Sequence, residues 1–159
     1  MANYCITNYV FTGNEEDIAK LSSFFTKHSK DDEHNENWLG NIAVEMGLST
    51  NDVYCRGWFW NVKLDNKKTL RMETETAWNP CFQLFDFIHK RFPSINYFFK
   101  AIEPGCEVYL TNDKEKRYFK YGSKYRVLEE KDIEKSIIAE RFISNLISKE
   151  MVGSLINQN

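Results

Sequence analysis

Apolar and polar residues alternate along several short segments of the chain, and elsewhere apolar residues recur every three or four positions. Alternation is typical of strands with one buried face, and the longer spacing is typical of amphipathic helices. The pattern predicts strands at 3–12, 54–64, 68–78, 95–103 and 106–112, a hairpin at about 116–128, and helices at about 14–27, 39–46, 80–92 and 130–151.

The order strand, helix, strand, strand, helix, strand predicts an α+β fold: a ferredoxin-like split βαβ antiparallel sheet with an added C-terminal hairpin and helix. The length of 159 residues and the 42% of hydrophobic residues fit one folded domain. We therefore predict a single domain at 1–159, with a ferredoxin-like core at 1–112 and a C-terminal extension at 113–159.

The second and third predicted strands are joined by a three-residue loop, Asp65-Asn66-Lys67, which fixes their register. With Leu64 opposite Lys68, Trp60 faces Met72 and Trp58 faces Thr74. The even-numbered side chains then share the buried face, and both indole rings belong to the core.

The amino-acid composition and net charge of the chain limit the classes of function that it can have. Aromatic residues make up 15% of the chain, an excess that the core alone need not absorb. The net charge of -2 argues against a protein devoted mainly to neutralising phosphates, although a local basic patch remains open. The start has no signal-like segment and no long apolar run follows, so we expect a cytoplasmic protein.

The four cysteines stand at positions 5, 55, 81 and 106, too far apart along the chain for one loop to wrap a zinc ion or an iron-sulfur cluster. We expect mostly buried thiols. The polar stretch 28–37 contains two histidines and four acids but lacks regular ligand spacing. We expect no metal site and no cofactor.

The segment Arg56-Gly57-Trp58-Phe59-Trp60 is the best candidate for a recognition motif. A basic residue, a glycine and alternating aromatic residues on a strand are also found in the stacking platforms of RNA-recognition domains. The predicted register favours core packing for Trp58 and Trp60. Base stacking and an apolar protein-binding surface are the alternatives.

Trp78 ends a predicted strand, Asn79 is a preferred helix cap, and Pro80 suits the first helical position. The free N–H groups of residues 80–82 could bind an anion beside Trp78, while a packed indole and a well-formed cap explain the same residues. Trp78 and Asn79 are therefore candidate binding residues.

Apolar pairs recur every four to five residues along the predicted helix 130–151, which gives it an unusually wide apolar stripe. A stripe of this width must be covered. Either the helix packs across the open face of the sheet, or it meets the same helix of a second subunit.

Two segments carry a family resemblance: the opening Met1-Ala2-Asn3-Tyr4-Cys5 with Val10-Phe11-Thr12-Gly13, and the later Glu73-Thr74-Glu75-Thr76-Ala77-Trp78-Asn79-Pro80. They resemble the YubB-type ferredoxin-like family of bacterial plasmids, phages and integrated elements. Asn79 stands where that family usually has Ser. The resemblance covers residues 1 to about 105 and implies a fold and a mobile-element setting, without an established reaction.

Ser-His-Asp groupings, Gly-rich phosphate loops and His-Glu-x-x-His helices are absent from the sequence. We therefore predict a non-enzymatic interaction module that uses its aromatic sheet surface and its C-terminal helix at 130–151 to contact a protein partner or itself. The alternative is single-stranded nucleic-acid binding, with loss of binding on Arg56→Ala; an enzyme with a pocket near Trp78 comes third. If the indole rings of Trp58 and Trp60 face water, the nucleic-acid alternative takes precedence.

Overall fold

The computed structural model of the chain describes residues 3–29 and 37–156, with Ser148 and residues 151–156 described by their backbone alone. This part of the chain has the predicted α+β class. Its strands are β1 (Tyr4–Thr12), β2 (Gly57–Asn66), β3 (Thr69–Ala77), β4 (Asn96–Glu103), β5 (Val108–Thr111) and β6 (Arg126–Val127). Its helices are α1 (Glu15–Lys27), α2 (Leu39–Glu45), α3 (Phe82–Arg91) and α4 (Glu130–Ile156), with a 3-10 turn η1 (Pro104–Cys106).

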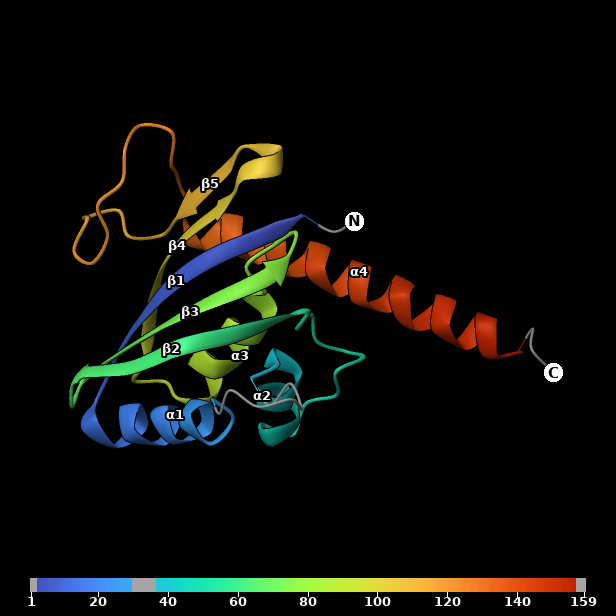
Figure 1. The fold of residues 1–159 in the computed structure, drawn as a ribbon, viewed down its shortest axis with the longest axis horizontal. Coiled ribbons are helices and arrows are strands. Elements are labelled where there is room, and N and C mark those ends of the chain that lie inside the picture. The colour runs from blue at the N-terminus through green and yellow to red at the C-terminus, as the bar shows by residue number, and fades with distance from the viewer. Residues whose placement is uncertain (1–2, 30–36, 157–159) are drawn as a thin grey trace.

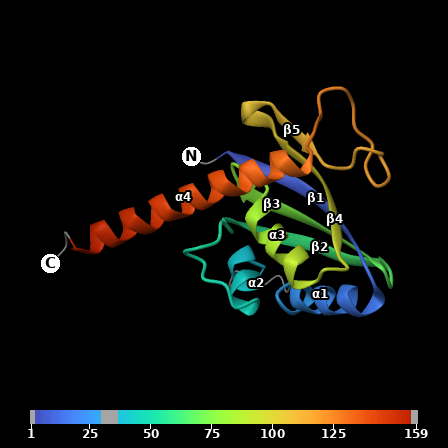
Figure 2. The ribbon, with the colours of Figure 1, turned by 180° about the vertical axis from the view of Figure 1, so that it is seen from behind.

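The strands form one sheet in the order β2-β3-β1-β4-β5-β6, in which β1 pairs antiparallel with β3 on one side and with β4 on the other. The short pairing of β5 with β6 is parallel. The six-stranded order is not that of a simple split βαβ unit, because β5 and β6 extend the sheet beyond β4. Helices α1, α2 and α3 lie together along one side of the sheet (Figures 1 and 2).

The core lies between these helices and the sheet. Odd-numbered residues of β1 point into it, and the rings of Tyr9 and Phe85 stack with centroids 4.0 Å apart. Phe11 and Phe25 extend the same aromatic cluster. Because successive strand side chains alternate between faces, the even-numbered residues of β1 lie on the opposite side, which we call the open face.

The predicted register between β2 and β3 is wrong. Trp58 lies opposite Glu75, and Phe59 lies opposite Thr74. Asn61 adopts a left-handed conformation (φ 54°) where the register shifts, so a bulge displaces the first half of β2 by one residue from the prediction. A one-residue slip exchanges the two faces of a strand.

Residues 112–125 form a loop, here called the β5–β6 loop, in place of most of the predicted hairpin at 116–128. Only Arg126 and Val127 pair with the sheet, and they do so parallel to β5. The hairpin prediction is therefore wrong, because side-chain hydrogen bonds within the loop replace a ladder, as described below.

Helix α4 does not pack across the open face, so that alternative is wrong. Its first half lies against α3, and its second half runs away from the body of the protein (Figures 1 and 2). Ile137 joins the buried core from this helix. Within the described residues, none of the helices has the length and apolarity needed to cross a membrane.

Candidate nucleic-acid interface

Cross-strand rows of side chains define the open face. One row contains Trp58, Glu75, Ile6, Ile102 and Tyr109, running from β2 to β5. The neighbouring row contains Trp60, Glu73, Asn8, Lys100 and Thr111. The next row contains Lys63, Arg71 and Val10. The open face therefore carries both acidic and basic side chains on β2 and β3, and a basic one on β4.

The assignment of Trp58 and Trp60 to the core is wrong. Phe59 fills the core position instead, and Trp58 is 36% exposed on the open face. Glu75 and Glu73 lie directly opposite the two tryptophans on β3. Because carboxylates repel phosphates, the immediate surroundings of the two indole rings suit nucleic acid poorly even though Trp58 meets solvent.

The β5–β6 loop is held by one buried acid. The carboxylate of Asp113 accepts hydrogen bonds from the backbone N–H groups of Arg117 (3.0 Å), Tyr118 (2.8 Å) and Phe119 (2.9 Å). The Tyr118 ring packs on Phe98 of β4, with centroids 4.8 Å apart. These contacts fix the loop against the β4 side of the open face.

The loop places lysines beside aromatic rings. Lys116 Nζ lies 4.8 Å from the centroid of Tyr121, and Lys124 Nζ lies 5.7 Å from that of Tyr109. The Tyr125 ring contacts Tyr109 and Tyr121, with centroids 5.4 and 5.6 Å apart. We call this set the tyrosine–lysine surface: Lys100, Tyr109, Lys116, Tyr121, Lys124 and Tyr125.

This surface was not predicted from the sequence, although residues 114–126 carry a signal for it. Residues 114–126 contain six Lys or Arg, one Glu and four aromatic residues, in a protein with a net charge of -2. Strand-like alternation in this stretch favoured a hairpin, and the local basic excess was hidden by the overall charge.

Arg56 lies apart from this surface. It precedes β2 and lines a cavity of about 230 Å³ with Trp38, Tyr54, Ser144 and Ile147, on the side of α4. The structure therefore does not bring Arg56 together with Lys116, Lys124 and the tyrosines. The prediction that Arg56→Ala abolishes nucleic-acid binding stays untested, and the position of Arg56 does not support it for binding on the tyrosine–lysine surface.

Asn79 does not cap α3, and the predicted anion site at residues 80–82 is already filled. The helix begins at Phe82 after Cys81, which has a left-handed backbone (φ 63°). The carboxyl group of Glu140 accepts hydrogen bonds from the N–H groups of Phe82 and Gln83 at 2.8 and 2.6 Å. A side chain of α4 thus occupies the place proposed for an external anion.

Trp78 is 51% exposed and also has a left-handed backbone (φ 68°). Its N–H donates to the carbonyl of Asn3 at 2.8 Å. The Asn79 side-chain oxygen is buried without a hydrogen-bond partner among the described residues. Trp78 and Asn79 stand at the β3 end, away from the β5–β6 loop.

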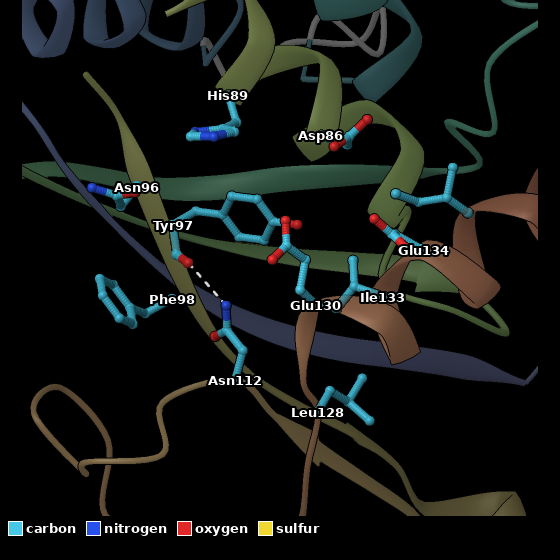
Figure 3. Close-up of a pocket in the computed structure, with 11 residues that line it drawn as sticks. Asp86, His89, Asn96, Tyr97, Phe98, Asn112, Leu128, Glu130, Ile133 and Glu134 are labelled. Carbon is cyan, nitrogen blue, oxygen red and sulfur yellow. Dashed lines mark hydrogen bonds between the residues drawn. The ribbon is translucent and has the colours of Figure 1, made fainter. Parts of the chain in front are cut away.

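A cavity of about 390 Å³ lies between β4, the end of α3 and the start of α4 (Figure 3). The Tyr97 ring projects into it between Asp86 and Glu130, and Glu134 stands nearby. Asp86 pairs with Lys90 at 2.7 Å. The carboxylates make this cavity unsuitable for phosphate, so it is chemically distinct from the tyrosine–lysine surface.

Three of the four cysteines are buried as predicted, and Cys106 is exposed. Burial raises the pKa of the Cys5 and Cys55 thiols to about 11.

Within the described ranges, no group of three or more His, Cys, Asp or Glu side chains could hold a metal ion. The stretch 28–37 lies mostly outside those ranges; His28 itself contacts Glu45, with Nε2 and Oε2 2.6 Å apart.

No family model matches the chain, and no curated protein or solved structure matches it.

Proposed function

We propose that the chain is a non-enzymatic binding protein that holds single-stranded nucleic acid on the tyrosine–lysine surface. The supporting observation is that Lys116 and Lys124 lie directly beside tyrosine rings on a face that α1–α3 leave uncovered. Tyrosine rings offer stacking partners for bases, each worth about 1–3 kcal/mol, and lysines neutralise the phosphates between them.

Single strands fit this surface better than duplexes because bases must be unpaired to stack on side chains. Ile6, Ile102 and Tyr109 occupy one row across three strands of the open face. This row spans about 10 Å, which accommodates two or three stacked bases.

The distribution of charge supports a path for the strand. On the β2–β3 side of the open face, the two glutamates Glu73 and Glu75 are accompanied by the cations Lys63 and Arg71, so the charges there are mixed. Lys100 and the β5–β6 loop give the β4–β5 side a local basic excess. We therefore place the nucleic acid over β4, β5 and the loop, and exclude Trp58 and Trp60 from its path.

We also propose that β1–β4 with α1 and α3 form a ferredoxin-like split βαβ core, and that the chain is a YubB-type protein of a mobile element. The antiparallel neighbours in the order β2-β3-β1-β4 support the first proposal. The opening segment and the segment before α3 support the second.

The test is fluorescence anisotropy with labelled single-stranded DNA and RNA oligonucleotides, with a duplex of the same sequence for comparison. We expect binding of the single strands that weakens steeply with added salt. The double variant Lys116→Glu/Lys124→Glu should weaken it at least tenfold, and Tyr109→Ala should weaken it with little change in the salt slope.

The matched controls are Lys131→Glu on α4 and Arg56→Ala, which lie away from the surface. Both should bind as the unmodified chain does. Absence of any binding at low salt, or equal losses for Lys131→Glu and the loop variants, would rule out the proposal.

A further inference from the structure

Helix α4 presents apolar side chains to solvent on the side that faces away from the body. Its inward residues Ile137, Glu140 and Ser144 are buried, and they are spaced three and four residues apart along the helix. On its outward side Ile138 and Phe142 are 64% and 65% exposed. Ala139, Ile143 and Leu146 are exposed on the same part of the helix.

Exposed apolar residues scattered singly are ordinary, but a contiguous set on one projecting helix is not. Leaving it in water forfeits about 25 cal/mol for each Å² that a partner could cover. The open face of this chain's own sheet cannot cover it, because α4 lies on the other side against α3.

We propose that this outward face binds the same face of a second copy, with the two α4 helices antiparallel about a two-fold axis. Such a contact is isologous, so each side chain of the face must meet a complementary one from the same set. The α4 sequence meets this condition.

The complementarity appears when the axis passes between Phe142 and Ile143. Phe142 then lies opposite Ile143 of the second copy, and Ala139 lies opposite Leu146. About one turn further out, Lys135 lies opposite Glu150, and the two-fold axis repeats this pair at the other end. The exposed lysine and glutamate thus bracket an apolar centre with opposite charges.

This charge pattern indicates that the partner bound by the outward face of α4 is a second copy of the chain. In the antiparallel register, apolar residues meet apolar residues and opposite charges meet at both ends, without any group from another molecule. The contact leaves the tyrosine–lysine surface free, so the dimer and nucleic-acid binding succeed or fail independently.

Sedimentation equilibrium of the full chain over a range of concentrations tests the proposal. We expect a monomer–dimer equilibrium, with Phe142→Glu raising the dissociation constant at least tenfold. The matched control is Val44→Glu, which alters an exposed apolar residue (60%) on α2 and should leave the constant unchanged. Circular dichroism checks that each variant keeps its helices.

A charge exchange tests the register. Lys135→Glu and Glu150→Lys should each weaken the dimer several-fold, and the double variant should restore it, because both ion pairs re-form with reversed polarity. A monomer at every concentration, a dimer insensitive to Phe142→Glu, or a double variant weaker than either single one would overturn the proposal.

Discussion

Glu140 on α4 caps α3 by accepting the backbone N–H of Phe82 at 2.8 Å and that of Gln83 at 2.6 Å. The side chain is fully buried, and burial raises its pKa to about 8 although the two hydrogen bonds act in the opposite direction. One carboxyl group therefore joins the C-terminal helix to the core and carries a pH dependence.

The first prediction concerns this pH dependence. The Glu140 carboxyl titrates near pH 4.5 when unfolded and near pH 8 when folded, so the native chain binds the extra proton between these values. Its contribution to stability is complete below about pH 4.5 and is lost as the pH rises through about 8.

Glu140→Gln removes this titration. Urea unfolding at several pH values should show that the free energy of unfolding, taken as wild type minus variant, declines from acidic to mildly basic pH. The contributions of all other titrating groups are the same in both proteins and therefore cancel in that difference. A difference that stays constant, or rises with pH, contradicts the assignment.

A second prediction compares Phe59 with Trp58. Phe59 is fully buried and its ring makes an edge contact with Phe25, with centroids 5.0 Å apart. We expect Phe59→Ala to cost about 3–5 kcal/mol. Trp58→Ala should cost less than about 1 kcal/mol, because the indole lies on the open face. Chemical denaturation gives both values, and the reverse ranking would restore the register expected from sequence.

The third prediction concerns Asp113. Replacing it with Ala leaves the N–H groups of Arg117, Tyr118 and Phe119 without their acceptor, at a cost of about 1–3 kcal/mol. Hydrogen exchange should show faster exchange at these three amides while the amides of β1 stay protected. The control is Glu115→Ala in the same loop, which should leave the exchange rates of these amides unchanged. If the rates also stay unchanged in the Asp113 variant, the Asp113 carboxylate does not hold the loop.

The fourth prediction tests the bulge in β2. Asn61 has a left-handed backbone, which glycine adopts freely and β-branched residues adopt at a cost of about 1–2 kcal/mol. Asn61→Gly should leave the thermal midpoint nearly unchanged, and Asn61→Val should lower it by several degrees. Equal midpoints for the two variants would place the bulge elsewhere.

The sequence predicts those parts of the fold that depend on near neighbours. Asn14 caps α1 as expected, with its side-chain oxygen 2.8 Å from the N–H of Asp17. The even-numbered residues of β3, including Met72 and Thr74, are buried as predicted.

Each failure depends on one residue whose role the alternation of polar and apolar positions does not reveal. The cap of α3 comes from Glu140, far along the chain from Phe82. The β5–β6 loop depends on one acid, Asp113, that satisfies three amides. The register of β2 depends on the backbone of Asn61, and a polar residue in an alternating strand gives no sign of a left-handed conformation.

The central position of β1 constrains how the chain reaches its fold during synthesis. Tyr4 pairs with Ala77 and Ile6 pairs with Ile102, so the first strand leaves the ribosome long before either neighbour is translated. At about 5–20 residues per second, several seconds pass before β4 emerges. During that interval the nascent β1 exposes Tyr9 and Phe11 and both of its hydrogen-bonding edges, which makes this segment the expected site of chaperone binding on the unfinished polypeptide.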